Sequence, residues 1–120
     1  MENFEVFTIA GTGKNGDKNG PGNEATFYHP YGIAIRNDRT IIVADSYNHK
    51  IKGIDLDGNV FTIAGTGQIG NQDGPGNIAT FYEPSGIAIR KNGTIVVSDT
   101  HNNSIREIRP RVLIKSAVEI

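Results

Sequence analysis

The amino-acid sequence predicts an all-β protein made of two copies of one four-stranded antiparallel unit. The first observation behind this prediction is an internal repeat: Val6–Gly13 and Val60–Gly67 both read VFTIAGTG, 54 residues apart. The motifs ATFY and GIAIR and an apolar strand follow each copy at the same spacing, without insertion or deletion. The second observation is that 15 glycines stand among short apolar runs, which favours strands joined by turns over helices. Identity at a constant spacing indicates a duplicated structural unit.

The first copy opens with a strand and a long loop. Glu5–Ala10 alternates and is rich in Val, Phe, Thr and Ile, so we predict a strand that ends at the following Gly-Thr-Gly. Lys14–Asn23 consists of Gly, Asn, Asp, Lys and Pro and contains several turn-forming pairs. The apolar residues Ala25, Phe27 and Tyr28 then anchor the end of the loop.

Four predicted strands with short turns complete the first unit. The near-continuous apolar run of the second strand indicates burial on both faces. The pair Asp57-Gly58, which precedes the fourth, is a strong hairpin signal. The predicted strands are Ile33–Arg36, Thr40–Ala44, His49–Asp55 and Val60–Ala64. Four short antiparallel strands per unit correspond to one blade of a β-propeller.

The second copy follows the same course and then diverges. Its predicted strands are Ile87–Arg90, Thr94–Ser98 and Ser104–Ile108. We therefore divide the chain into a first repeat over residues 1–59 with the leading strand 5–10, a second repeat over residues 60–110 and a divergent tail over residues 111–120. The composition of the tail allows an edge strand, but the tail lacks the TIAGTG ending.

Several motifs at fixed spacing resemble the NHL repeat in its longer-loop, 54-residue form. They are TIAGTG, the loop sequence DGPGN at Asp73–Asn77, ATFYxPxGIAI, and V-[AS]-D-[ST]-x-N-x-x-I. The first copy has the Asn48-His49 pair that gives the family its name, whereas the second has Asn102-Asn103. The resemblance covers about residues 6–110. It implies a six-bladed or similar β-propeller that acts as a binding platform for proteins or, in some members, RNA; a few related propellers are enzymes.

Bulk composition narrows the classes of partner. Twelve Lys and Arg against 13 Asp and Glu give a formal charge of −1, so no global field attracts nucleic acid or an anionic membrane. With no cysteine there is no disulfide framework and no thiolate metal site. No signal peptide and no apolar run of the roughly 20 residues that span a bilayer is seen, so we expect a cytoplasmic protein.

We predict no catalytic residues, no cofactor and no metal. Asp17 and Asp73 give each long loop a single carboxylate, fewer than a calcium site generally needs. The three histidines are not spaced as a zinc triad within one strand. Neither a Ser–His–Asp arrangement nor a carboxylate pair recurs in the two copies.

Two polar residues in each unit, an aspartate at the end of the second strand and an asparagine in the turn after it, are interpreted as structural. We expect the aspartates to accept hydrogen bonds from backbone N–H groups of the following turn, and the asparagines to occupy a left-handed turn position. These residues are Asp45, Asn48, Asp99 and Asn102.

Strand alternation places both long loops on one face of the predicted blades, together with the turns 46–49 and 100–103. This long-loop face displays a set of rings suited to contact with a partner. The rings belong to His29, Tyr31, Tyr47, His49 and His101.

The leading functional hypothesis is a non-enzymatic module whose long-loop face recognises another protein. RNA binding is one alternative, supported by a local excess of basic residues in the first copy: Lys14, Lys18, Arg36, Arg39, Lys50 and Lys52. A second alternative is a propeller enzyme of the lactonase or lyase type with a metal in its central channel.

Two blades cannot close a ring, because propellers contain about four to eight. We expect the chain to assemble with itself, with a trimer favoured, or to join the remaining blades of a longer parent chain. In an oligomer, Glu5–Ala10 can complete the second blade of a neighbouring copy beside Ser104–Ile108. The competing interpretation is that Arg111–Ser116 fills that edge within its own chain.

Overall fold

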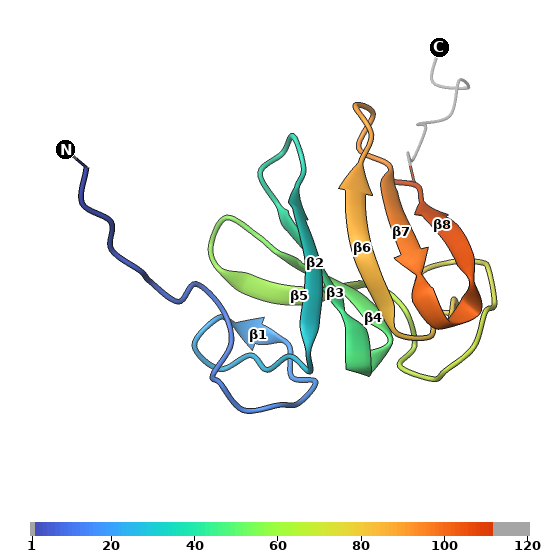
Figure 1. Ribbon diagram of the computed structural model, residues 1–120, viewed down its shortest axis with the longest axis horizontal. Helices are drawn as coiled ribbons and strands as arrows, with labels where there is room; N and C mark the ends of the chain where they lie inside the picture. The colour runs from blue at the N-terminus through green and yellow to red at the C-terminus, as the bar shows by residue number, and fades with distance from the viewer. Residues whose placement is uncertain (1, 112–120) are drawn as a thin grey trace, which may run out of the picture.

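A computed structural model describes residues 2–111 and contains two antiparallel sheets (Figure 1). The first sheet has the order β1-β5-β4-β3-β2 and the second the order β6-β7-β8. Single 3-10 turns, η1 (Ser46–Asn48) and η2 (Thr100–Asn102), follow the middle strands. The strands are β1 (Gly20–Pro21), β2 (Pro30–Ile35), β3 (Ile41–Asp45), β4 (Lys50–Ile54), β5 (Asn59–Ala64), β6 (Pro84–Ile89), β7 (Ile95–Asp99) and β8 (Ser104–Ile108).

The all-β fold class is confirmed, and the two sheets are blades of the propeller type. β2 and β6 each start three residues before the predicted strand, at Pro30 and Pro84. The register of each strand against its neighbour shifts near this start, between Pro30 and Ile33 and between Pro84 and Gly86. A bulge of this kind breaks the period-two pattern from which a strand is predicted.

The main core lies between the two sheets. Ile42, Ile51 and Ala64 of the first sheet meet Ile95 and Val97 of the second, and each is at most 2% exposed. Burying a side chain of this size contributes roughly 1.5–3 kcal/mol. The two sheets therefore stack face to face as neighbouring blades.

A second core holds the first long loop against the other face of the first sheet. Ala25 is fully buried against Val43, Ile54 and Val60, with Phe27 packed beside them. The loop also contributes β1, which pairs with β5. The predicted loop is therefore packed rather than open.

The predicted leading strand Glu5–Ala10 is not part of a sheet in this structure. Its backbone leaves the first sheet on the side away from the second sheet (Figure 1). Val6 and Phe7 are 95% and 76% exposed. The physical reason is that a strand needs a neighbouring edge, and β1 already lies beside β5.

The outer edge of β8 pairs with no strand among residues 2–111. In the first blade, β5 covers the equivalent edge of β4. Residues 112–120, which contain most of the segment predicted to compete for this edge, lie outside the described residues.

Candidate functional site

A buried carboxylate organises the loop end of the first blade. Asp45 is fully buried, and its Oδ1 accepts a hydrogen bond of 2.7 Å from the backbone N–H of Tyr28. Its Oδ2 accepts one of 2.7 Å from Asn48 Nδ2 and lies 2.9 Å from Lys52 Nζ. Asn48 Nδ2 also donates to the Gly16 carbonyl at 2.7 Å. One aspartate thus ties the anchor, the 3-10 turn and the long loop together.

The second blade repeats this arrangement with an arginine. Asp99 Oδ1 accepts from Tyr82 N–H at 2.9 Å, and its Oδ2 accepts from Asn102 at 2.7 Å. Arg106, in place of lysine, lies 2.7 Å from the same Oδ2 and also bonds the loop carboxylate of Asp73.

The structural role predicted for these Asp and Asn residues needs two corrections. The backbone N–H groups that bond Asp45 and Asp99 belong to the anchor that precedes the first strand of each blade, and the following turn donates only through its asparagine side chain. The left-handed position belongs to the next residue, His49 with φ 55° and Asn103 with φ 54°. The asparagine amide instead acts as a donor from within the 3-10 turn to the long loop.

The buried cation of this network was missed from the sequence. Lys52 is fully buried between Asp45 and Asp17, whose carboxylate lies 2.8 Å from its Nζ. Burial raises the pKa of Asp17, but hydrogen bonds from Lys50 and Lys52 outweigh it and hold this pKa below the ordinary value. The available signal was the recurrence of a long cationic side chain 54 residues later, at Arg106.

The same contacts weaken the RNA alternative. Lys52 is buried, and the Nζ of Lys50 lies 2.6 Å from Asp17. Two of the six basic side chains counted for a phosphate-binding surface are therefore neutralised within the blade. Phosphate binding needs cations that can reach the backbone of the nucleic acid.

The long-loop face of the two blades is built around two residues in strained backbone conformations. His29 and Glu83 have φ values of 54° and 50° and stand directly before Pro30 and Pro84. Non-glycine residues in this region cost of order 1–3 kcal/mol and persist where the surrounding structure over-determines them. The constraint on His29 is its neighbour Tyr28, whose N–H bonds Asp45 and whose carbonyl accepts from Tyr47 N–H.

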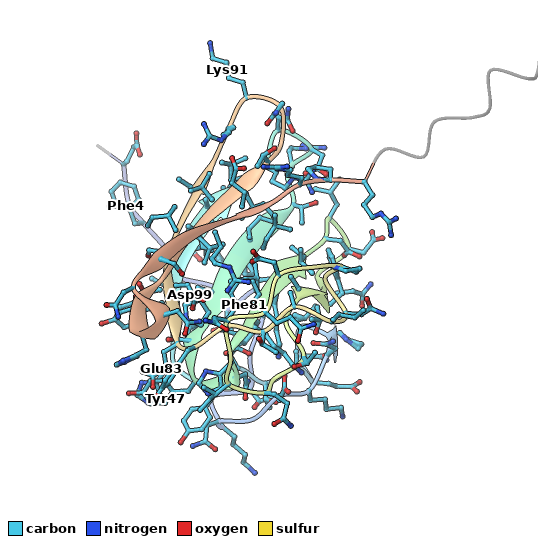
Figure 2. All side chains as sticks on the ribbon, turned by 90° about the vertical axis from the view of Figure 1, so that its right-hand side faces the viewer. Phe4, Tyr47, Phe81, Glu83, Lys91 and Asp99 are labelled. Carbon is cyan, nitrogen blue, oxygen red and sulfur yellow. The ribbon has the colours of Figure 1, made fainter. Side chains whose placement is uncertain are left out.

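Four of the five predicted recognition residues converge on a hollow of about 200 Å³ at the junction of the blades. The rings of His29 and Tyr47 stack at 4.2 Å between centroids, 5° from parallel. Figure 2 shows Tyr47 and Glu83 at one end of the molecule and Lys91 at the other. The lining residues are His29, Tyr31, Ser46, Tyr47, Glu83, Ser85, Thr100 and His101.

His49, the fifth predicted residue, does not line this hollow. Its Nδ1 accepts a hydrogen bond of 3.0 Å from the backbone N–H of Glu83. Burial lowers the pKa of His49 below its ordinary value, against the opposing effect of the Glu83 and Asp99 carboxylates. This hydrogen bond links the first blade to the strained residue of the second.

Glu83 supplies the carboxylate of the hollow, and the sequence did not predict it. Its Oε1 lies 3.2 Å from His101 Nε2. Beside this pair, Ser85 Oγ contacts the hydroxyls of Thr100 and Ser98. Stacking rings and one carboxylate suit a cationic guest.

The hydroxyl side chains at the hollow contact one another. Ser85 Oγ bonds the hydroxyls of Ser98 and Thr100 rather than a histidine or a carboxylate, the pairing that activates a nucleophile. Residues 2–111 contain no group of three or more His, Asp or Glu side chains that could hold a metal ion.

Comparison with known proteins decides the family. The NHL repeat model matches residues 27–54 and 81–108. The chain is a member of the NHL-repeat family. Both matched segments run from the anchor to the third strand of a blade, and so contain the Asp–Asn–cation network of this family member.

Relatives of this NHL-repeat chain are much longer proteins. SUPPRESSOR OF QUENCHING 1, chloroplastic, of Arabidopsis thaliana is 47% identical over 96 residues, which cover 79% of the chain and 9% of that protein. NHL repeat-containing protein 2 of Gallus gallus is 42% identical over 109 residues, 88% of the chain and 15% of that protein. The chain thus spans less than a sixth of either relative.

One more distant relative is named as an enzyme. The probable peptidyl-alpha-hydroxyglycine alpha-amidating lyase pgal-1 of Caenorhabditis elegans is 33% identical over 79 residues, 65% of the chain and 21% of that protein. Among solved structures, a structural genomics protein of unknown function from Bacteroides thetaiotaomicron superposes with a TM-score of 0.77 at 26% identity. That match covers 82% of the chain and 26% of the other protein.

Within the described residues, no helix has the length and apolar character to cross a membrane. The plant relative is named as chloroplastic. The cytoplasmic location therefore stays a prediction.

Proposed function

We propose that the chain is a non-enzymatic recognition module that binds a partner protein in the hollow between its two blades. The observation that carries this proposal is the placement of the stacked His29–Tyr47 rings opposite the Glu83–His101 pair. Tyr31 and Tyr47 are 74% and 44% exposed, so their rings are available to a partner. Exposed tyrosines grouped at one site are frequent hot spots of protein interfaces.

The chemistry of the hollow favours a basic side chain of the partner. A Lys or Arg group over the face of an aromatic ring gains roughly 0.5–1 kcal/mol at an exposed site. A carboxylate beside it adds a charge-assisted hydrogen bond. Glu83 and Tyr47 supply these two elements from neighbouring blades. Small hydroxyl side chains, Ser46, Ser85 and Thr100, leave room between them.

Site-specific photo-crosslinking tests this function. We replace Tyr31 with a photoreactive phenylalanine analogue, and as a control we place the same analogue at Leu56, which is 66% exposed in a turn at the other end of the blade. We expect crosslinks to a distinct protein from position 31 and not from position 56. Glu83→Gln should lower the yield several-fold, because the carboxylate is lost while the size is kept. Crosslinks to the chain itself alone, or equal yields from both positions, would contradict protein recognition at this face.

A lyase is the second candidate function, because a relative with 33% identity is named as one. Turnover of a peptidyl-α-hydroxyglycine by the purified chain, with stoichiometric metal in the same sample, would establish it. Absence of turnover with added zinc or calcium, at a chain concentration that binds the partner protein, would leave recognition as the function.

A further inference from the structure

The outer edge of β8 lines a groove of about 1060 Å³. One wall is formed by Ser104–Arg109 and the other by the second long loop at residues 73–76. In the first blade the corresponding elements, β4 and β1, enclose β5 between them. The groove therefore stands where a fourth strand completes the blade.

The sequence that fits this groove occurs at the N-terminal end of the chain. Val6–Ala10 is identical to Val60–Ala64, which fills the equivalent position in β5. Val60 pairs with Ile54 and is 3% exposed, whereas Val6 is 95% exposed. Ile108 is the residue 54 positions after Ile54, and it faces the core between the blades.

The residues that follow Val6–Ala10 make the same backbone hydrogen bonds as the residues that follow β5. Gly11 N–H donates to the Gly22 carbonyl at 2.9 Å, as Gly65 N–H donates to Gly76 at 2.9 Å. The next residue, Thr12, bonds the Ala25 carbonyl in the same way as its counterpart. From this anchored end the chain runs away from its own second blade (Figure 1). It therefore lies far from the open edge of β8 in its own chain.

The open faces of the two-blade unit repeat its internal interface. Ile87 and Ile89 of β6 pack on the core that includes Ile51 of β4. Their equivalents on the outer side of the first blade, Ile33 and Ile35, are 62% and 67% exposed. The equivalent of Ile51 on the outer side of the second blade is Ile105, which is 71% exposed. The open face of the first blade thus carries the residues that β6 contributes to the internal interface. The open face of the second blade carries the residue that β4 contributes.

Charge supports the same alignment. In the first blade Asp55 N–H bonds the Asn59 carbonyl, so these two residues lie opposite each other. The equivalent pair across the groove is Arg109 and Glu5, of opposite sign. Opposite charges directly across antiparallel strands are favourable. One position fits less well. In the first blade Phe61 packs over Gly53, and the equivalent of Gly53 beside the groove is Glu107. The ring of Phe7, the equivalent of Phe61, must therefore take another rotamer.

We propose that Val6–Ala10 of one copy fills the groove beside β8 of the next, and that the copies close head to tail into a ring. The first blade of each copy stacks on the second blade of its neighbour. Heterologous contacts of this kind form rings when the rotation closes. Propellers of about four to eight blades correspond to two to four copies, and we expect three.

Light scattering on a sizing column tests the ring. We expect a discrete species of about 39 kDa, three chains of 13.0 kDa. Val6→Asp should weaken association about tenfold or more, because it places a carboxylate in the apolar core between the blades. Phe4→Asp is the matched control, since Phe4 is 84% exposed and its equivalent, Gly58, lies in a turn. Circular dichroism checks that both variants stay folded.

A charge exchange identifies the strand that occupies the groove. Glu5→Arg and Arg109→Glu should each shift the association midpoint several-fold to higher concentration, and the double variant should recover it. A monomer at all concentrations would overturn the proposal, as would a mass that grows without limit or one that Val6→Asp leaves unchanged. A ring that persists in Val6→Asp but is lost on removal of residues 112–120 would assign the groove to that tail instead.

Discussion

Lys52 and Arg106 each compensate the charge of a buried aspartate, one in each repeat. Each lies against a fully buried aspartate, Asp45 or Asp99, whose other oxygen caps the backbone of the anchor. Removing one partner of a buried pair leaves an uncompensated charge, which costs roughly 3–5 kcal/mol. A long cation is therefore required at this position, while its identity as lysine or arginine is not.

This requirement can be measured with a pair of variants. Lys52→Met, similar in length but uncharged, should lower the free energy of unfolding by about 3 kcal/mol. Lys52→Arg should cost less than about 1 kcal/mol, because the second blade accommodates arginine at the equivalent position. Urea denaturation followed by circular dichroism gives both values. Equal losses for the two variants would show that the free energy of unfolding depends on the shape of the side chain at position 52 rather than on its charge.

At the residue scale the sequence predicted the rings of the hollow better than its charges. Tyr31 and Tyr47 were found because aromatic residues in predicted turns stand out. Glu83 was missed because the first repeat has His29 at that position, so comparing the copies shows no pattern. Lys52 was counted with the basic residues of the first copy that support RNA binding, whereas β4 lies between β3 and β5 with the long loop over it.

At the scale of the elements, glycine sets how closely the blades approach. A Cβ at Gly32 in β2 would lie 2.1 Å from the Ser85 carbonyl oxygen and 2.9 Å from the Ile87 nitrogen, both backbone atoms of β6. The same repeat position in β6 is Gly86, where a Cβ would meet the hydroxyl of Ser98 at 2.8 Å. A backbone cannot move aside as a side chain can.

The two glycines should therefore respond differently to the same change. Gly32→Ala should destabilise the chain by roughly 1–3 kcal/mol, because the added methyl group forces the blades apart. Gly86→Ala should cost less in chain stability and act mainly on assembly, since its open side is where a neighbouring copy would stack. Thermal unfolding and the solution mass separate the two effects. A larger loss of stability in Gly86→Ala than in Gly32→Ala would contradict this account of the blade contact.

The strands themselves could be predicted from the sequence because their signals are local. Apolar runs and Gly or Asn turns predicted seven of the eight strands within a few residues, including Ser104–Ile108 without error. β1 was missed because it is two residues long and depends on contact with β5. Glu5–Ala10 has strand composition, but the open edge of β8 lies on the far blade of its own chain, and local composition carries no information about a partner.

At the scale of the whole molecule, the two blades formed by residues 2–111 leave two faces and one strand position open. Ile33, Ile35 and Ile105 are large apolar side chains that equivalent contacts bury between the two blades. Exposed apolar area of this kind marks an interaction surface. In the ring that we propose, the hollow near Tyr47 recurs once per copy, so that a partner with several basic side chains could bind with avidity.

The measurement that tests strand exchange most directly is a disulfide across the groove. The chain has no cysteine, so Phe7→Cys and Glu107→Cys introduce one defined pair at the position equivalent to Phe61 opposite Gly53. Directly opposed strand residues lie close to the separation that a disulfide bridges. We predict covalent dimers and trimers on a non-reducing gel for the double variant. Phe7→Cys combined with Lys91→Cys, at the other end of the blade, should give neither species. A bond formed only within single chains, or none under oxidising conditions, would contradict the exchange.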